Sequence, residues 1–393
     1  MGKIVNLILH KNTTLIAIAV LLVLLMIEGF TGIAVHRSFG FFLCVSVWML
    51  ILAFAVLKRM AGYSLKHTAK HTAFLLTHAG VFMVLLFGCL GSLQFQKLHV
   101  RAFSETPENM AFDDDYAVFQ IPFQITLKNF EAEFYDNLQP KSYKAEMVLN
   151  NEDTEKRTVL AVNHPTRFMG YDVYLESYDQ RHPTHPDYVT VLAVYDPYGF
   201  AKYFGIVVLL AGLGLSVWTL PFAKNRMAAL FVALFGLGFS FMVFSPYVFR
   251  GKHLVPALQS LWFAPHIAVY MFAYGALAVA CLLSIYALFK SKALIWSSID
   301  FLLHLGVSLM GIGLLFGALW AKTAWGNFWR FDLKETWAAI AWIACIGVLH
   351  YRYVYEKHRK SGAILVIMAF LLLQMCWFGV NYLPTILRSL HRY

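Results

Sequence analysis

Nine apolar runs, each about as long as a transmembrane helix, constrain this chain more than any other feature of its sequence. A hydrocarbon core of ~30 Å requires roughly 17 to 25 helical residues. Because unpaired backbone polar groups cannot cross lipid, we expect each run to be a helix. Charged residues make up only 14% of the chain, against about 25% of an ordinary soluble domain. The runs lie near 14–34, 40–57, 72–92, 203–220, 227–247, 265–289, 299–320, 337–354 and 362–380.

The first run resembles a signal peptide, because a short segment with Lys3 and Lys11 precedes it. It has no small-residue cleavage site, however, and Glu28 interrupts its far end. We therefore expect this run to remain in the protein as a membrane span.

Residues 94–200, between the third and fourth runs, differ from the rest of the chain. Segments such as VFQIPFQITLKNF and YVTVLAVYD alternate polar and apolar residues, and the turn-forming NNED lies between two such segments. This alternation is typical of strands. The fold class that we predict is an all-α polytopic membrane protein, with about nine transmembrane helices and a small antiparallel β domain on the outer side.

The net charge of +10 indicates topology and not nucleic-acid binding, because basic residues mark the cytoplasmic loops of membrane proteins. With the N-terminus inside, fourteen Lys and Arg residues fall in inner loops and eight in the short outer segments. The β domain, residues 321–336 and the C-terminus then lie outside. The cysteines all fall inside apolar runs and none forms a C-x-x-C pair, so we expect buried apolar residues without disulfides or a thiolate metal site. They are Cys44, Cys89, Cys281, Cys345 and Cys376.

Three histidines, His78, His304 and His350, fall inside apolar runs, where an ionisable side chain needs a partner or a cavity. At 1.5 Å per residue, His78 lies ~9 Å and His350 ~7 Å from the inner ends of their helices. Two imidazoles at matching depth can bind the iron of one haem from opposite sides. Alternatively, each imidazole donates a hydrogen bond to a carbonyl of a neighbouring helix. Depth alone does not exclude His304 from the pair.

Two further histidines lie on the outer side. His266 begins the sixth run at the outer surface, and His391 lies in the C-terminal tail. They are either a second pair of ligands or amphipathic anchors at the interface. His36 and His253, in short outer loops, have no special sequence context.

The segment WGNFWRFDLKETW, residues 325–337, is aromatic and charged at once, although it lies between two apolar runs. A helical or near-helical turn with Trp325, Phe328 and Trp329 offers flat apolar faces to a planar ring. The alternative is an aromatic belt at the membrane interface.

The charged residues of the same region favour a ligand with carboxylates. Arg330, Lys334 and Arg388 can pair with two carboxylates by charge-assisted hydrogen bonds, and haem has a flat ring and two propionates. An aromatic belt does not require the additional acidic residues Asp332 and Glu335.

These segments resemble a known family. WGNFWRFDLKETWAAIAW is similar to the tryptophan-rich motif of the haem-handling membrane proteins of cytochrome c assembly. VPALQSLWFAPH, VLHYR and GVNYLPTILRSLH resemble other segments of the CcsA (ResC) branch, and VNHPTRFMGYDVYLESYD, residues 162–179, resembles the signature of the partner protein CcsB (ResB). The chain thus resembles a compact CcsB–CcsA fusion. Its parts are CcsB-like helices in 1–93, the β domain in 94–200, a CcsB-like fourth span in 201–222, and a CcsA-like domain in 223–393 with the external loop 321–337.

The resemblance implies a haem exporter and cytochrome c synthase (haem lyase) in the bacterial inner membrane. Haem b enters at an intramembrane site and is attached outside, by thioether bonds, to the CxxCH motif of apocytochrome c. The implied partners are apocytochrome c, thiol-reducing thioredoxin-like proteins and membrane lipid, with no nucleic acid.

The resemblance also implies the site residues. The intramembrane iron ligands are His78 and His350, and the external ones are His266 and His391. The residues that fall on the tryptophan-rich motif are Trp325, Gly326, Trp329, Asp332, Lys334, Glu335 and Trp337. Among all of these, His266, His391, Trp325, Trp329, Asp332 and Trp337 are expected to serve the attachment reaction, while Phe328, Arg330 and Arg388 complete the haem-binding set.

The sequence departs from the family pattern at two positions of the motif, where Phe331 replaces the usual Trp and Leu333 the usual proline. The loop is therefore expected to turn differently. The CcsA-like part is also short, with five expected spans. The β-domain signature residues serve either packing or a haem or substrate contact; they are Asn163, His164, Arg167, Gly170 and Tyr171.

Two other functions are compatible with these residues. A membrane cytochrome b-type electron carrier would bind two bis-histidine haems on opposite sides of the membrane, although His266 and His391 at the water interface do not favour it. A transporter of another planar or anionic solute would keep the aromatic loop and leave the four histidines without a common role.

Overall fold

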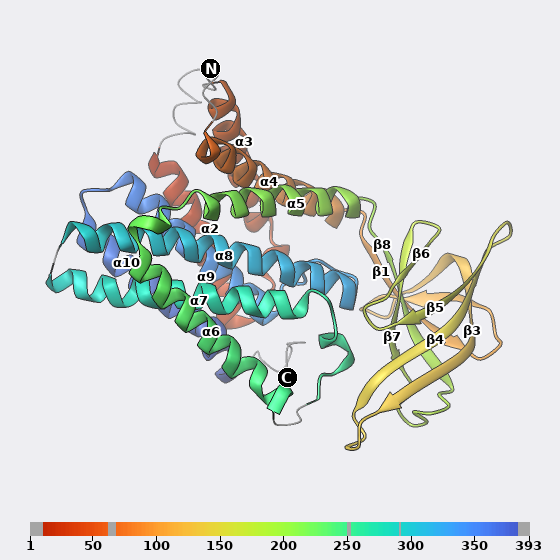
Figure 1. Ribbon diagram of the computed structural model, residues 1–393. Helices are drawn as coiled ribbons and strands as arrows, with labels where there is room; N and C mark the ends of the chain where they lie inside the picture. Colours follow the sequence, from red (N-terminus) through yellow and green to blue (C-terminus); the bar gives the residue numbers. More distant parts are fainter. Residues whose placement is uncertain (1–10, 62–67, 250–252, 291, 384–393) are drawn as a thin grey trace.

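The computed structural model describes residues 11–61, 68–249, 253–290 and 292–383. Within these residues the chain forms a helical bundle and a separate β domain that lies at one end of the bundle (Figure 1). We call this end of the bundle the β-domain end and the other the opposite end.

The described part of the chain contains nine helices that are long and apolar enough to cross a membrane. The prediction of a polytopic helical membrane protein is confirmed. The helices are α2 (Lys11–Thr31), α3 (Phe39–Ala61), α4 (Ala69–Ser92), α5 (Gly199–Trp218), α6 (Arg226–Phe249), α7 (Phe263–Phe289), α8 (Ala293–Trp325), α9 (Leu333–Val354) and α10 (Arg359–Trp377).

Helices α4 and α5 pack with their backbones in close approach, and glycines make this possible. A Cβ atom on Gly80 would lie 2.6 Å from Cα of Leu209, and one on Gly212 would lie 2.5 Å from the backbone nitrogen of Thr77. Small residues allow such approach between membrane helices. Because Thr77 precedes His78, this contact fixes the position of one of the intramembrane histidines.

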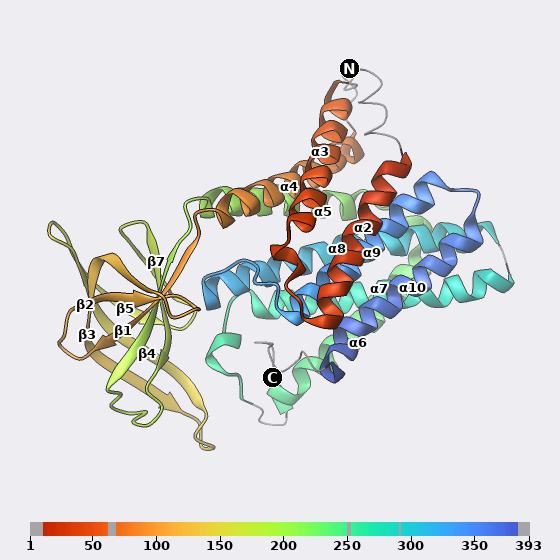
Figure 2. The same ribbon diagram turned by 180° about the vertical axis from the view of Figure 1, so that it is seen from behind.

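Helix α9 packs against α2, α8 and α10. Figure 2 shows α2 on the side of the molecule where α9 and α10 also lie. The core of this region contains Trp337 and Ile340 of α9, which are fully buried. The first and the eighth of the apolar runs are thus neighbours in space.

The β domain is one antiparallel sheet of eight strands in the order β5-β4-β3-β2-β1-β8-β7-β6, which confirms the predicted antiparallel β domain. Its alternating apolar residues form a separate core, in which Val100, Ile125, Leu149 and Val191 are fully buried. The strands are β1 (Gln96–Phe103), β2 (Glu108–Phe112), β3 (Val118–Phe134), β4 (Pro140–Asn150), β5 (Glu155–Ala161), β6 (Thr166–Phe168), β7 (Tyr171–Tyr178) and β8 (Tyr188–Tyr195).

The β domain is connected to the bundle through its central strands. Strand β1 follows α4, strand β8 precedes α5, and the two strands pair along their whole length from Gln96↔Tyr195 to Phe103↔Tyr188. At the junction, Nζ of Lys202 lies 2.9 Å from both carboxylate oxygens of Asp196. This ion pair is largely buried, so it ties the start of α5 to the end of β8.

Candidate functional site

His78 of α4 and His350 of α9 have the same local geometry. The Nδ1 atom of His78 lies 2.9 Å from the carbonyl oxygen of Phe74, and Nδ1 of His350 lies 2.9 Å from that of Ile346. A carbonyl oxygen only accepts, so each Nδ1 carries the proton and each Nε2 keeps its lone pair. A metal-binding histidine is usually oriented in this way. The predicted alternative, a bond to a neighbouring helix, is not what these two residues form, because each carbonyl belongs to the histidine's own helix.

The two imidazoles come from different helices and lie within electrostatic reach of each other. The ring of His78 also stacks on Phe74, with the ring centroids 3.9 Å apart. In the part of the chain that the structure describes, no group of three or more His, Cys, Asp or Glu side chains can hold a metal ion. A pair of imidazoles therefore suits a metal that brings its remaining ligands with it, and the iron of a porphyrin is such a metal.

His304 of α8 repeats this geometry. Its Nδ1 atom lies 2.7 Å from the carbonyl oxygen of Asp300, one turn earlier in the same helix. His304 is within electrostatic reach of His350, and its side chain is exposed on the helix surface. It remains a third imidazole beside the predicted pair.

His266 lies near the start of α7, and a neighbouring helix orients it. Its Nδ1 atom lies 2.7 Å from the carbonyl oxygen of Gly313 on α8. The ring also packs on Gly317, where a Cβ atom would lie 2.7 Å from Cε1 of His266. His391 and Arg388, the other predicted residues of this region, lie outside the described residues.

The tryptophan-rich segment is less helical than expected. Trp325 is the last residue of α8 and α9 begins at Leu333, so only the ends of residues 325–337 are helical and the stretch between them is irregular. Gly326 ends α8 with φ +79°, and a Cβ atom there would lie 2.7 Å from Cγ2 of Val194 in the β domain. The left-handed conformation of Gly326 ends the helix, and the close approach to β8 leaves no room for a side chain at this position.

The aromatic residues of this segment pack on each other and on the bundle. Phe328 meets Tyr203 of α5 edge to face with ring centroids 4.8 Å apart, and Trp325 packs on Trp320 at 5.0 Å. Trp329 lies 6.2 Å from Phe331. The rings of Trp325, Phe328 and Trp329 are half-buried, so the segment keeps aromatic surface available to a planar ligand.

The two acidic residues of the motif, Asp332 and Glu335, form hydrogen bonds to backbone amides of the segment. Asp332 is the N-cap of α9 and forms a capping box with Glu335, an arrangement that satisfies free amides at a helix start. The Glu335 carboxylate accepts hydrogen bonds from the backbone nitrogens of Arg330 (2.8 Å) and Asp332 (3.2 Å). The side chains of Arg330 and Lys334 are half-buried, and neither forms an ion pair with a described carboxylate.

Trp337 lies below the segment and supports it. Its side chain is fully buried, its Nε1 donates a hydrogen bond to the carbonyl oxygen of Gly29 on α2 (3.2 Å), and its ring meets the edge of Phe30. This placement gives Trp337 no exposed face for a ring ligand. Its predicted part in the reaction stays a prediction, and the contacts are those of a residue that holds α9 against α2.

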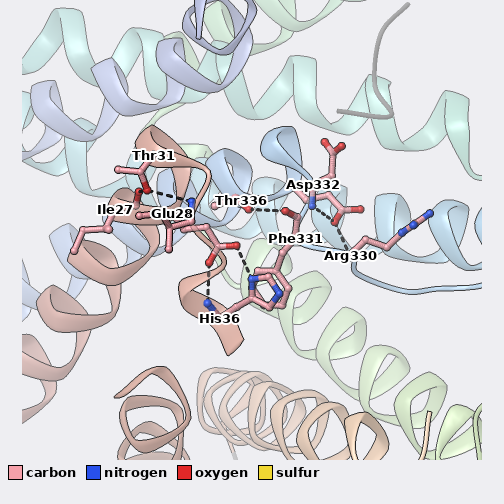
Figure 3. Close-up of polar contacts among 10 residues, drawn as sticks. Ile27, Glu28, Thr31, His36, Arg330, Phe331, Asp332 and Thr336 are labelled. Carbon is pink, nitrogen blue, oxygen red and sulfur yellow. Dashed lines mark hydrogen bonds and ion pairs between the residues drawn. The ribbon is translucent and has the colours of Figure 1, made fainter. Parts of the chain in front are cut away.

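A histidine–carboxylate pair beneath Phe331 was not expected from the sequence (Figure 3). Glu28 is buried and accepts two hydrogen bonds from His36, one from Nδ1 (2.6 Å) and one from the backbone nitrogen (2.9 Å). The His36 ring stacks on Phe331, with centroids 4.1 Å apart and planes parallel within 1°. Phe331 has φ +55°, so this stack holds a strained residue of the loop. The sequence feature that could have predicted this pair is Glu28, a carboxylate at the end of an apolar run and eight residues before His36.

A second pair that sequence reasoning missed joins the loop to the β domain. Nζ of Lys322 in α8 lies 2.9 Å from Oδ2 of Asp172 in β7 and 3.1 Å from the carbonyl oxygen of Gly326. The same cation lies over the rings of Tyr174 and Phe328. Asp172 and Tyr174 belong to the segment 162–179, so this signature contacts the tryptophan-rich loop.

The other signature residues serve turns and packing. Asn163 has φ +64° and donates a hydrogen bond to the carbonyl oxygen of Pro256, before α7. The backbone nitrogen of His164 closes a turn on Ala161, and Gly170 turns the chain with φ +84°. The carbonyl of Arg167 accepts from Lys156, and the hydroxyl of Tyr171 donates to Gln96.

The chain is similar to two families over most of its length, from residue 58 to residue 388. A family model described as "Cytochrome C assembly protein" matches residues 200–388, and one described as "ResB-like family" matches residues 58–197. Helix α5, expected to be CcsB-like, falls inside the first of these ranges except for Gly199. His78 lies in the ResB-like range and His350 in the assembly range.

Several proteins named "Cytochrome c biogenesis protein CcsA" are similar to this chain over part of its length. One from Pyropia yezoensis is 30% identical over 254 residues, which cover 49% of this chain and 79% of that protein. One from a strain of Prochlorococcus marinus is 31% identical, covering 44% of this chain and 67% of the relative. For one from Nymphaea alba, the identity is 35% and the coverages are 36% and 57%. The chain thus spans little more than half the length of some of these relatives.

Proposed function

Because this chain belongs to the CcsA family of cytochrome c biogenesis proteins, with a ResB-like part fused before it, we propose that it exports haem and attaches it to apocytochrome c. It is a multi-pass membrane protein, and its role is in cytochrome c biogenesis. The proposed transport begins at His78 and His350 and ends at His266 and the tryptophan-rich loop.

The observation that carries this proposal is the matched geometry of His78 and His350. Each imidazole is held by a bond from Nδ1 to its own helix, which leaves Nε2 as a ligand, and the two rings are within electrostatic reach. One ring comes from the ResB-like part and the other from the assembly part. In this proposal each family supplies one of the two iron ligands. Fusion of the two parts in one chain would keep both ligands together.

The proposed attachment site lies at the β-domain end. His266 is oriented by Gly313, and the aromatic loop offers surface to the porphyrin. Arg330 and Lys334 are cations that can pair with propionates. His391 as the second iron ligand and Arg388 as a further propionate partner remain predictions.

The attachment reaction adds each cysteine thiol of CxxCH across a vinyl group of haem. The sulfur bonds to one vinyl carbon, the proton goes to the other, and nothing leaves. The protein needs no nucleophile of its own, since the substrate provides the thiols. Its contribution is to hold the vinyl edge against the thiols, and such placement can lower the barrier by several kcal/mol, on the order of 7 to 11.

The orientation proposed is that of the bacterial inner membrane with the N-terminus in the cytoplasm. The β domain, the tryptophan-rich loop and the C-terminus then lie on the periplasmic side, where unfolded cytochromes c arrive. Thioredoxin-like proteins would keep the substrate thiols reduced there. The excess of Lys and Arg in the loops of the opposite end supports this orientation.

The test is an absorption spectrum of the detergent-purified protein beside single variants. The wild type should show a low-spin bis-imidazole haem. His78→Ala and His350→Ala should each lose this signal, and free imidazole should restore part of it. His164→Ala, in the β domain, is the matched control and should not differ from wild type. A wild-type preparation that takes up no haem would contradict the proposal.

A further inference from the structure

A small cavity lies between α8, α9 and α10 at the opposite end of the bundle, and the proposed function does not use it. Its volume is about 60 Å³, which is enough for a carboxylate or a few water molecules. It is lined by Trp296, Asp300, Arg352, Tyr355, Glu356, His358 and Arg359.

Two guanidinium groups of the cavity lie over the same indole. Cζ of Arg352 lies 5.6 Å and Cζ of Arg359 lies 6.0 Å from the ring centroid of Trp296. Arg352 is bound to Asp300 through Nε, at 2.6 Å, whereas Arg359 forms no ion pair with any described carboxylate. Arg359 is therefore a cation at this cavity whose charge is available to an anion.

His304 lies on α8, the helix that contributes Trp296 and Asp300 to the cavity. It is one turn from Asp300, ~6 Å along the axis at 1.5 Å per residue. With Nδ1 bonded to the Asp300 carbonyl, its Nε2 is the ligating nitrogen, and no hydrogen bond occupies it in the described part of the chain. An ionisable side chain within an apolar span is costly, so its presence there indicates a function.

We propose that His304 and Arg359 form a loading site for haem, where Nε2 of His304 takes the iron and the guanidinium of Arg359 takes a propionate. This inference rests on the proposed function and adds a step before the His78/His350 pair. The ligand class is a metalloporphyrin with free carboxylates, since a metal ligand on α8 lies one turn from Asp300, which lines the cavity together with the carboxylate-binding cation Arg359. Because His350 is within electrostatic reach of His304, the iron can exchange one imidazole for the other.

The loading site is tested by titrating haem-depleted full-length protein in detergent with ferric haem. A background variant that lacks all four predicted iron ligands, with His78, His350, His266 and His391 changed to alanine, should still bind haem, with the high-spin spectrum of a single histidine ligand. Adding His304→Ala to this background should weaken that binding about tenfold or more, and so should His304→Gln, which keeps a polar side chain. Equal affinities of the background variant and both His304 derivatives would overturn the proposal.

The carboxylate half of the site is tested with the dimethyl ester of haem. Arg359→Gln should slow the uptake of haem by a factor of roughly three to ten and leave the uptake of the ester unchanged. Lys360→Gln removes the same charge beside the cavity without lining it, so it should behave as wild type. Identical effects of Arg359→Gln on haem and on its ester would overturn the assignment.

The two proposals fail in different ways. If wild-type protein binds no haem, the proposed function is wrong. If wild-type protein shows the bis-imidazole spectrum and His304→Ala takes up haem at the same rate, only the loading site is wrong.

Discussion

Lys322 at the end of α8 and Asp172 in β7 form an ion pair of 2.9 Å, although 150 residues separate them in the sequence. The Lys322 side chain is only 3% exposed, and its Nζ also binds the carbonyl of Gly326. The β domain is therefore linked, through Asp172 and Lys322, to Gly326, where the irregular part of the tryptophan-rich segment begins. Through this contact the ResB-like part is tied to the loop in the assembly part.

Removing the anion of this pair should destabilise the protein. Asp172→Ala leaves the Lys322 ammonium buried without its counter-ion, and breaking a buried pair in this way costs about 3 to 5 kcal/mol. Because Asp172 is partly exposed, we expect the lower end of that range. The measurement is thermal unfolding in detergent, together with the yield of mature cytochrome c.

The control for this prediction is an exposed pair of the same domain. Arg157 and Glu155 form an ion pair whose side chains are largely in solvent, and such pairs contribute about 0 to 1 kcal/mol. Arg157→Ala should therefore leave the melting temperature unchanged. Equal losses in Asp172→Ala and Arg157→Ala would show that the buried pair does not hold the loop.

Gly326→Ala should distort the loop for two reasons. A φ of +79° costs a residue other than glycine about 1 to 3 kcal/mol, and the new Cβ would meet Val194 at 2.7 Å. Shortening the partner in the double variant Gly326→Ala/Val194→Ala should recover the steric part and leave the backbone part. A stability assay on the two single variants and the double variant separates these contributions; additive losses would exclude the contact with Val194.

The helices and the sheet could be predicted because their signals are local. Nine apolar runs of sufficient length predict the nine long helices found among the described residues, and period-two alternation in residues 94–200 predicts strands. Helix α8 illustrates the limit. It continues through Lys322 to Trp325 because the lysine is neutralised by Asp172, and no local pattern reveals a partner so far away.

The histidines of the site also differ in whether their role follows from local sequence or depends on partners far away in the chain. Depth in a span selected His78, His304 and His350 from the sequence, since depth follows from helical rise. The role of His36 could not be predicted, because its partners Glu28 and Phe331 meet it only after α2 packs beside α9. The expectation that the acidic residues of the loop mark a ligand site stays a prediction, whereas the helix cap that Asp332 and Glu335 form was not predicted.

The Glu28–His36 pair should be necessary for the position of Phe331. Glu28→Gln keeps an acceptor for Nδ1 of His36 but loses the charge, and a hydrogen bond to a charged group is worth about 1 kcal/mol more than a neutral one. Glu28→Leu removes both acceptors and frees the His36 ring from its stack. We expect cytochrome c maturation to fall in the order wild type, Glu28→Gln, Glu28→Leu. Glu133→Leu, which removes an exposed carboxylate of the β domain, should have no effect, and full activity of Glu28→Leu would refute the role of the pair.

His99 should make the stability of the β domain depend on pH. The hydrogen bond of its Nδ1 to the Glu176 carboxylate, with a further bond of Nε2 to Asp114, raises the pKa of His99 above its ordinary value. A raised pKa in the folded state means that the stabilisation is complete below the unfolded pKa, about 6.5, and is lost as the pH rises through the folded value. Hydrogen exchange of β1 and β7 in the full-length protein should speed up over that interval. His99→Gln should remove the dependence, and an unchanged pH profile in this variant would contradict the assignment.

The α4–α5 contact offers a way to disturb the proposed inner iron site without changing either of its proposed ligands. A Cβ on Gly212 would lie 2.5 Å from the backbone nitrogen of Thr77, so Gly212→Ala must push α4 away at the residue next to His78. Gly214, two residues later on the same helix, has nothing within 4 Å of its hypothetical Cβ, and Gly214→Ala should be neutral or stabilise the helix by up to about 1 kcal/mol. We therefore expect the bis-imidazole absorption to be lost or weakened in Gly212→Ala and retained in Gly214→Ala. If both variants keep the wild-type spectrum, the position of His78 does not depend on the packing of α4 against α5, and the iron would have to be held by another pair of imidazoles.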